Sequence, residues 1–572
     1  MENKSLNEYS KEELIKIINS LKKQKKFGLV WEDKPEKVAI ECEQKLPVLK
    51  EVEEKTINGA NSSAPTNIII EGDNYHTLSV LNYTHAGKID VIYIDPPYNT
   101  GNKDFIYNDR FIDKEDSFRH SKWLSFMAKR LSLAKNLLSP KGVIFISIDD
   151  NEQANLQLLC NSIFGEDCRV ANMIWRRKTG ASDANGLATI TEHILVYTRN
   201  SDKSTWSTFF RGNSDSYDRN RYRLSDEYKN ERGNYYTDSL DRGGLRYSDS
   251  LNYPIECPDG TKTYPNGRLS FANDGWTWKW GQEKVKWGIE NGFIVFKKSK
   301  NKPSGWTVQY KNYMFVDNNC NHIERAAPFK NLILDILNTD GAMEQKAIFG
   351  KKVFNNPKPV KLVKFLTYLV KENNIVLDFF AGSGTTGQAV MELNQEDGGN
   401  RQFILCTNNE NQIAEEVTYP RIKTVVTGTR PDGTKYSDGI PANVRYFKTD
   451  FVEKDDTLDK LRRKLSPACE DMIRIREGAY EKLIDDDMLK VYKNSHGLTA
   501  IVYDRFELEE HLAKIEELET DSPVNLYVFS YTKHDRLDEI DKPLKHTYIS
   551  QPIPEGVLEI YKRIFNQKGG NR

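Results

Sequence analysis

The stretch VIYIDPPY, residues 91–98, decides the fold of this chain. Its first four residues are apolar and mostly β-branched, which predicts a buried strand ending at Ile94. Two consecutive prolines cannot continue the hydrogen-bond ladder of a sheet, so the chain must turn directly after Asp95. The turn presents a carboxylate, a carbonyl without a neighbouring N–H and an aromatic ring at the carboxyl end of a strand. In open parallel α/β sheets, ligands bind at that edge.

A second stretch of the same kind, IVLDFFAGSGTT, covers residues 375–386. Its apolar start predicts another buried strand, and the glycine-containing loop leads into a predicted helix at 385–394. Glycines let the backbone approach a ligand closely, and the helix N-terminus offers N–H donors to a carboxylate. The loop lacks the Gly-Lys-Ser/Thr sequence of a phosphate-binding P-loop. A tight strand-to-helix turn without a ligand is the alternative interpretation.

Strands and helices alternate around these two stretches. The predicted strands cover residues 67–70, 91–94, 143–148, 170–175, 193–198, 375–377 and 403–406. The predicted helices cover residues 75–86, 121–138, 151–164, 360–371 and 385–394. This order is typical of βαβ units, so the sequence predicts an α/β fold with a mostly parallel sheet.

The composition changes at about residue 201. Residues 201–330 hold 23 of the chain's aromatic residues and six of its nine tryptophans, with 21 Lys and Arg against 16 acids. Turn-forming residues are dense and apolar periodicity is poor, so we expect an inserted irregular or β-rich domain. Trp276, Trp278 and Trp280 alternate, which also fits one face of a strand packed in a core.

Composition and charge limit the class of protein. The net charge is −1, so any nucleic-acid site must be a local patch. The seven cysteines are scattered, which predicts neither a metal site nor a disulfide framework and fits a reducing cytoplasm. The N-terminus is polar and no apolar run reaches 18 residues, so we expect no signal peptide, no membrane span and a cytoplasmic location.

Together the two stretches resemble the signature motifs of amino-methylating DNA methyltransferases, Asp-Pro-Pro-Tyr and Phe-x-Gly-x-Gly. Their order, with the aromatic insert between them, resembles the β arrangement of these enzymes. Over residues 30–450 the chain resembles the modification (Mod) subunits of type III restriction–modification systems. The segments that carry this resemblance are 95–101, 107–111, 357–359, 407–410 and 417–422. The last 120 residues resemble such subunits only by position and size.

The resemblance implies a circularly permuted class I S-adenosylmethionine-dependent methyltransferase fold, with a Rossmann-like sheet, an inserted target-recognition domain and a C-terminal α+β module. We expect an N-terminal helical arm at 1–60, opened by a capping-box pattern at residues 10–13 and a helix to residue 26. The other expected parts are the catalytic half at 61–200, the target-recognition domain at 201–340, the cofactor-binding half at 341–451 and the module at 452–572, for assembly or DNA contact. Helices are predicted in the module at 456–465, 468–493 and 507–518, and a strand at 524–529.

The catalytic residues implied by the resemblance are Asp95, Pro96, Pro97 and Tyr98. The amino nitrogen of adenine is a poor nucleophile because its lone pair is delocalised into the ring. Asp95 and the Pro96 carbonyl can accept its two N–H bonds and free the lone pair for attack on a sulfonium methyl. Tyr98 would stack on the flipped base, since chemistry on a base requires extrusion from the duplex. Alternatively, Tyr98 simply caps the sheet edge.

The cofactor expected from the resemblance is S-adenosylmethionine. The residues expected to bind it are Asp73, Lys358, Asp378, Phe380, Ala381, Gly382, Ser383, Gly384, Thr385 and Glu410. Asp73 would contact the adenine of the cofactor, or simply form a turn. Lys358 would pair with the methionine carboxylate, or remain a solvated lysine between prolines. Many relatives hold the ribose with an acid directly at the end of the second strand, and here the acid is displaced to Glu410, which puts ribose binding in doubt.

Double-stranded DNA is the expected partner, bound by basic residues of the aromatic insert. The expected DNA contacts are Arg219, Arg221, Arg223, Lys279, Lys284, Lys286, Lys297 and Lys298. We expect a homodimer and a separate restriction (helicase–nuclease) subunit, since the chain carries no helicase or nuclease motif of its own. No metal is expected.

The predicted function is site-specific methylation of the N6 amino group of adenine. Cytosine-N4 methylation is the second hypothesis, and Asp rather than Ser at position 95 favours adenine. A stand-alone adenine methyltransferase is a third. A cofactor-dependent recognition subunit without activity is a fourth, and the intact Asp95, Gly382 and Gly384 argue against it.

Overall fold

The computed structural model describes residues 30–565 except 62–63, 181–185, 245–246, 495, 505 and 536, together with residues 10 and 13. The chain forms two compact units, one of Met1–Arg211 with Lys330–Arg572 and the other of Gly212–Phe329. The predicted helix at 10–26 lies outside the described residues. Ser10 and Glu13 are described, and they exchange the reciprocal backbone-to-side-chain hydrogen bonds of the predicted capping box.

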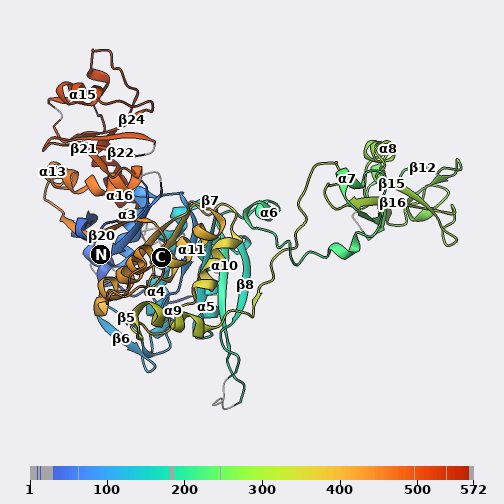
Figure 1. The fold of residues 1–572 in the computed structure, drawn as a ribbon, viewed down its shortest axis with the longest axis horizontal. Helices are drawn as coiled ribbons and strands as arrows, with labels where there is room; N and C mark the ends of the chain where they lie inside the picture. The colour runs from blue at the N-terminus through green and yellow to red at the C-terminus, as the bar shows by residue number, and fades with distance from the viewer. Residues whose placement is uncertain are drawn as a thin grey trace. The chain divides into compact units, whose positions relative to one another are not determined.

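A large central sheet organises the first unit (Figure 1). Its main path runs β1-β20-β3-β19-β18-β4-β7-β9-β8-β17, and β2 (Ile57–Asn58) pairs with β20. In that order the strands are Lys45–Glu51, Asn443–Glu453, Thr66–Glu71, Gln402–Thr407, Ile375–Asp378, Ile89–Ile94, Leu138–Ile148, Thr191–Thr198, Arg169–Arg176 and Leu332–Ile333. From β20 to β7 every neighbouring pair is parallel, whereas β9 is antiparallel to both β7 and β8. The mostly parallel α/β sheet is confirmed.

The order of the strands shows the circular permutation. The late strands β18 and β19 lie between the early strands β3 and β4. β18 pairs directly with β4, with Leu377 opposite Ile92. Because parallel neighbours end at the same edge, the loops after residues 94 and 378 emerge side by side. Two segments far apart in the sequence therefore form one ligand-facing edge.

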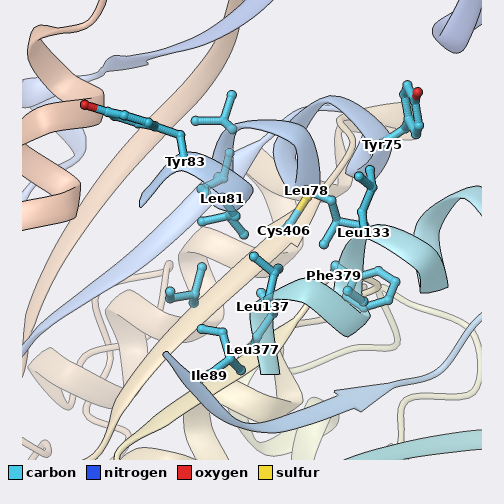
Figure 2. Close-up of a cluster of buried hydrophobic side chains, with 14 of the residues drawn as sticks. Tyr75, Leu78, Leu81, Tyr83, Ile89, Leu133, Leu137, Leu377, Phe379 and Cys406 are labelled. Atoms are coloured by element: carbon cyan, nitrogen blue, oxygen red, sulfur yellow. The ribbon is translucent and has the colours of Figure 1, made fainter. Parts of the chain in front are cut away.

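Helices cover both faces of this sheet. Side chains alternate between the faces of a strand. Ile404 and Cys406 of β19 belong to the same buried cluster as side chains of α3 (Asn74–Thr84) and α4 (Arg119–Leu137), and Figure 2 shows Leu78, Leu133 and Leu137 around Cys406. The alternate residue Leu405 faces α11 (Thr385–Asp397), where a Cβ at Gly387 would come within 3.1 Å of its side chain.

Further helices complete the layers. They are α5 (Gln153–Phe164), α9 (Asn338–Phe349), α10 (Val360–Leu369) and α12 (Tyr419–Thr427). α5 packs beside α4, and α11 packs between α10 and α12. No helix among the described residues is long and apolar enough to cross a membrane.

The C-terminal module is an α+β structure, as predicted. Helices α13 (Leu458–Ala468) and α14 (Glu470–Glu477) precede a five-stranded sheet. Its strands β21 to β25 are Glu481–Asp485, Leu489–Asn494, Gly497–Val502, Val524–Phe529 and Tyr548–Ile553, with α15 (Leu508–Glu516) and α16 (Glu555–Phe565). The predicted helix at 468–493 is wrong beyond Glu477, because Gly478, with φ +63°, ends the helix and two strands follow.

The second unit, Gly212–Phe329, is β-rich and irregular, as predicted. A three-stranded sheet is formed by β10 (Tyr235–Ser239), β16 (Trp306–Tyr313) and β15 (Ile294–Lys298). Its other elements are β11 (Asp241–Gly243) paired with β14 (Trp276–Trp278), β12 (Ile255–Glu256) paired with β13 (Lys262–Thr263), and α8 (Gln282–Glu290). Trp278 and Trp280 are buried in its core, whereas Trp276 stays half-buried outside that core.

Candidate active site

The loop after β4 presents its polar groups at the sheet edge. Asp95 directly follows the buried strand and keeps 27% of its side-chain surface exposed. The carbonyl of Pro97 accepts a hydrogen bond from Nε1 of the buried Trp123 at 2.8 Å. No donor among the described residues reaches the Pro96 carbonyl. The Pro97 carbonyl is therefore bound within the protein, whereas the Pro96 carbonyl is available to a ligand.

Asn99 fixes the far end of this loop. Its backbone has φ +58°, a conformation that asparagine tolerates better than most residues. Its side chain is fully buried and donates to Oε1 of the buried Glu152 at 2.5 Å. Nδ1 of His120 lies 2.6 Å from the same oxygen. The hydrogen bond between Asn99 and Glu152 thus fixes the turn from the protein interior.

A polar cluster surrounds Asp95. Nζ of Lys358 lies 3.0 Å from Oδ1 of Asp95 and 3.3 Å from Oε2 of Glu192, and it donates to the Tyr98 hydroxyl at 2.7 Å. That hydroxyl lies 2.9 Å from Asp95 and 3.0 Å from Glu192, so it can donate to one of them. Arg177 lies 3.3 Å from the second oxygen of Glu192. Two cations therefore balance two carboxylates around one tyrosine hydroxyl.

Burial and charge set the protonation of this cluster. Burial raises the pKa of Asp95, while Lys358 lowers it and Glu192 raises it. Burial alone would lower the pKa of Lys358, but Asp95 and Glu192 raise it above its ordinary value. The pKa of Tyr98 stands well above its ordinary value, because of burial and both carboxylates. At neutral pH, Lys358 is therefore protonated and Tyr98 is a neutral phenol.

The glycine loop after β18 has the backbone that its sequence predicts. Gly382 and Gly384 have φ values of +49° and +80°, which favour glycine. A Cβ at Gly384 would lie 3.3 Å from Cγ2 of Thr418, whose hydroxyl donates to the Gly382 carbonyl at 2.6 Å. The N–H of Ala381 donates to the carbonyl of Cys406. The helix α11 begins directly after the loop without a side-chain cap.

Asp378 lies buried beneath this loop. Its carboxylate accepts from the N–H of Phe380 at 3.0 Å and from the hydroxyl of Thr386 at 2.5 Å. Burial, with a smaller contribution from the charge of Asp95, raises its pKa to about 7, although both hydrogen bonds lower it. The two carboxylates at the ends of neighbouring strands are thus close enough to affect each other.

Ser383 and Thr385 face the protein interior. Nη1 of Arg421 donates to both hydroxyls, at 3.1 and 2.9 Å, and Nε donates to Gln388 at 2.8 Å. Arg421 is fully buried, and burial lowers its pKa to about 10. The sequence showed this arginine within segment 417–422 but not its role, which is to fasten α12 under the glycine loop.

Asp73 lies in the turn between β3 and α3, at the same sheet edge. It caps α3 by accepting from the N–H of Tyr75 at 2.7 Å. Nη2 of Arg130, which is fully buried, lies 3.2 Å from Asp73 and 2.7 Å from Glu36. Asp73 is therefore a helix cap and an ion-pair partner, and its contact with a cofactor stays a prediction.

The remaining predicted cofactor residues differ in position. The ring of Phe380 packs against Phe126, with centroids 5.9 Å apart. Glu410 is exposed at the start of a short 3-10 turn, Glu410–Gln412, after β19. Lys358 contacts the residues around Asp95 rather than the glycine loop. The structure brings Lys358 and the Asp-Pro-Pro-Tyr turn together, and ribose binding by Glu410 stays a prediction.

The basic residues predicted to contact DNA all belong to the second unit. Several lie against acids or aromatic rings: Lys279 is 3.0 Å from Asp238, and Lys298 is 3.1 Å from Asp259. The guanidinium of Arg221 stacks 3.8 Å from the ring of Tyr236. Further contacts join Lys284 to Asn319, Lys297 to Thr237 and Arg223 to the Asn220 carbonyl. Arg219 and Lys286 are exposed.

Known proteins resemble this chain in sequence. The StyLTI Mod subunit, from a type III restriction-modification enzyme of Salmonella typhimurium, is 33% identical over 424 residues, which are 69% of this chain and 60% of that protein. The EcoPI Mod subunit of Escherichia phage P1 is 31% identical over 63% of this chain and 60% of its own length. The type II methyltransferase M.KpnI of Klebsiella pneumoniae is 32% identical over 61% of this chain and 82% of its own length.

The chain spans about 60% of the length of the two Mod subunits that it matches. A family model described as DNA methylase matches residues 89–418, which include both the Asp-Pro-Pro-Tyr turn and the glycine loop. Since that match covers more than half of the chain, the chain belongs to the DNA methylase family.

Proposed function

We propose that the chain transfers a methyl group from S-adenosylmethionine to the N6 amino group of adenine in double-stranded DNA. One observation carries this proposal: Asp95 and the glycine loop end neighbouring parallel strands, β4 and β18, at one sheet edge. A carboxylate acceptor and a backbone cradle therefore lie side by side. The Asp-Pro-Pro-Tyr sequence and the family membership support methyl transfer to an amine.

The glycine loop suits the cofactor. S-adenosylmethionine carries a carboxylate and, when bound, supplies an electrophilic methyl group. The uncapped N-terminus of α11 offers free N–H groups to an anion, and Gly382 and Gly384 keep the loop backbone bare of side chains. Arg421 fixes this loop from behind through Ser383 and Thr385. Asp378 would stay beneath the loop and hold its turn.

The target amine would be held by Asp95 and the Pro96 carbonyl. Both are acceptors, so they bind the two N–H groups and leave the nitrogen lone pair directed at the methyl group. The amine and the Lys358 ammonium compete for the same carboxylate, and binding of the base would shift Lys358 toward Glu192. The nitrogen loses its proton only after it has gained the methyl group, so Asp95 need not be a strong base.

Tyr98 would stack against the flipped base. Its hydroxyl is held by Lys358 and by a carboxylate, so the ring has a fixed orientation before the base arrives. Glu192 and Arg177 would act behind Lys358, as residues that position the cation. The Gly212–Phe329 unit would read the DNA sequence, since it is a separate β-rich unit with a local excess of basic residues.

The similarity to Mod subunits of type III restriction-modification enzymes supports a place in such a system, with a restriction subunit as partner. A homodimer is the assembly that we propose. A stand-alone adenine methyltransferase would have the same chemistry without that partner. Asp rather than Ser at position 95 favours adenine-N6 methylation, so cytosine-N4 methylation is the second hypothesis.

The direct experiment mixes the purified chain with unmodified plasmid DNA and methyl-labelled S-adenosylmethionine. We expect label in the DNA with the wild-type protein and none with Asp95→Ala. Calorimetry should show that Asp95→Ala still binds S-adenosylmethionine, because the substitution leaves the glycine loop intact. Label transfer by Asp95→Ala at the wild-type rate would refute the role of Asp95.

A further inference from the structure

A second cluster of potential ligands lies in the C-terminal module, on elements separate from the methyl-transfer site. Asp504 follows β23, Glu507 immediately precedes α15, and His511 lies on that helix. One side-chain donor atom from each of the three residues lies within 4.8 Å of the other two. Among the described residues of this chain, no other group of His, Cys, Asp and Glu side chains is placed in this way.

His511 is the unusual member of this cluster. Only 3% of its surface is exposed, and neither ring nitrogen has a hydrogen-bond partner among the described residues. Its neighbours on the buried face of α15 are Leu508, Leu512 and Ile515, which belong to the apolar core of the module. An unpaired polar group in such a place costs free energy, and it calls for a water or an ion that satisfies it.

The local geometry directs His511 toward the two acids. Glu507 and His511 are four residues apart along a helical turn, so their side chains lie on the same face of α15. Asp504 reaches the same point from the loop after β23, where its Oδ1 accepts from the N–H of Phe506 at 2.8 Å. The second oxygen of Asp504 and the exposed carboxylate of Glu507 remain able to bind a cation.

We propose that Asp504, Glu507 and His511 bind a divalent transition-metal ion, with zinc as the reference ion. A neutral imidazole with two carboxylates suits zinc and its neighbours in the series, whereas calcium and magnesium prefer ligand sets made of oxygen alone. The ion would satisfy one nitrogen of the buried imidazole and neutralise two nearby carboxylates. Three protein ligands leave a fourth position for water, because Glu507 lies at the surface.

Such an ion would fasten α15 to the end of β23, which is a strand in the middle of the module's sheet. The N-terminus of α15 also attracts the two carboxylates, so the cation competes with the helix dipole. The site should therefore bind zinc more weakly than a closed structural site of four cysteine or histidine ligands. The proposed role is structural and independent of methyl transfer.

The test uses the full chain, without an affinity tag, after treatment with a chelator. Zinc alone is titrated into the protein by calorimetry, and the thermal unfolding midpoint is recorded with and without zinc. Cobalt replaces zinc in a parallel titration, since its visible spectrum reports the coordination geometry. The variants are Glu507→Gln, Asp504→Asn and His511→Leu, and the matched control is Glu510→Gln, an exposed acid in the first turn of the same helix.

We expect one zinc ion per chain and a higher unfolding midpoint in its presence. Loss of an outer-shell partner typically weakens metal binding by about 10–100-fold, so each ligand substitution should weaken it at least as much. Glu510→Gln should bind zinc like the wild type. Glu507→Gln alters an exposed group and Asp504→Asn a half-buried one, so they keep the test valid even if His511→Leu fails to fold.

Zinc binding that survives both acid substitutions unchanged would overturn the proposal. So would the absence of stoichiometric binding by the wild type, which would leave His511 with a packing role only in the core of the module. A cobalt spectrum typical of six oxygen ligands would equally contradict coordination by His511. Methyl transfer should be the same with and without zinc.

Discussion

The ammonium of Lys358 lies 3.0 Å from Oδ1 of Asp95, in the middle of the candidate active site. The side chains also share the hydroxyl of Tyr98, and the ammonium is 3.3 Å from Glu192. An acceptor carboxylate must stay ionised to bind an amine. Burial raises the pKa of Asp95, the lysine lowers it by supplying the opposite charge, and Glu192 raises it.

Lys358→Met and Glu192→Gln should therefore shift the pH dependence of methyl transfer in opposite directions. Burial already raises the pKa of Asp95, and removal of the lysine raises it further, so the acid limb of kcat/KM moves to higher pH. Removal of the Glu192 charge lowers that pKa, so the limb moves to lower pH. The measurement is kcat/KM for a DNA substrate from pH 5 to 9.

The control for this pair is Lys361→Met, which removes an exposed lysine from α10, the helix that follows Lys358. Its profile should match that of the wild type. If Lys358→Met and Glu192→Gln shifted the acid limb in the same direction, the charge balance around Asp95 would have been misassigned.

Gly384→Ala should weaken S-adenosylmethionine binding far more than Gly398→Ala. Both glycines have left-handed backbone, with φ +80° and +69°, and they flank the same helix α11, so both substitutions carry similar strain. A Cβ at Gly384 would press on Thr418 at 3.3 Å and deform the loop, whereas at Gly398 it would meet nothing within 4 Å. Calorimetric affinities of the two variants give the comparison. Equal affinities would remove the glycine loop from the cofactor site.

Asp378→Asn should stabilise the cofactor-free protein above neutral pH. Burial raises the pKa of Asp378 to about 7, so the folded state binds its proton more tightly than the unfolded state does. The wild type therefore loses stability as the pH rises from about 4 to about 7, and the variant does not. At pH 8 the variant's free energy of unfolding should exceed that of the wild type by at most about 4 kcal/mol. This limit comes from a pKa difference of about three units, at ~1.4 kcal/mol for each unit.

Thermal unfolding of both proteins at pH 5, 6, 7 and 8 measures this difference. Asp438→Asn, at an almost fully exposed acid, is the control and should show no pH-dependent gain. An Asp378→Asn protein that is less stable than the wild type by the same amount at every pH would contradict a buried, perturbed carboxyl.

Much of the fold could be predicted because its signals are local. Apolar runs that end at Asp95 and at Asp378 gave the two central strands, and the glycines marked the start of α11. The prediction of a helix at 468–493 failed because charged residues hid the alternation of β21 and β22. Gly478 was the available signal, since its left-handed backbone ends α14.

The site was only partly predictable because several of its contacts are non-local. No local pattern around Glu192 indicates a partner, and its contact with Lys358 arises because β9 lies between β7 and β8 in the sheet. Arg421 belonged to a quoted motif, yet its burial behind Ser383 and Thr385 depends on how α12 packs against α11. Sequence patterns show which face a residue occupies, but not which distant charge it meets.

Exchange of residues 212–329 for the same unit of a relative should change the DNA sequence that is methylated and keep the chemistry. A folded, active chimera that still methylates the original site would place recognition elsewhere.

Within the same unit, Lys286→Ala removes an exposed lysine and should weaken DNA binding on all sequences. The slope of log affinity against log salt concentration should fall by about one unit. Lys229→Ala, at an exposed lysine of the same unit outside the predicted set, is the control. DNA affinity is measured between roughly 50 and 200 mM salt, the range over which phosphate contacts make the affinity fall steeply.

The central claim is tested most directly by mass spectrometry of nucleosides from DNA that the purified chain has modified. The presence of Asp95 in the Asp-Pro-Pro-Tyr turn predicts N6-methyladenine and no N4-methylcytosine, with neither product from Asp95→Ala. The appearance of N4-methylcytosine, or of N6-methyladenine made equally well by Asp95→Ala, would contradict the account.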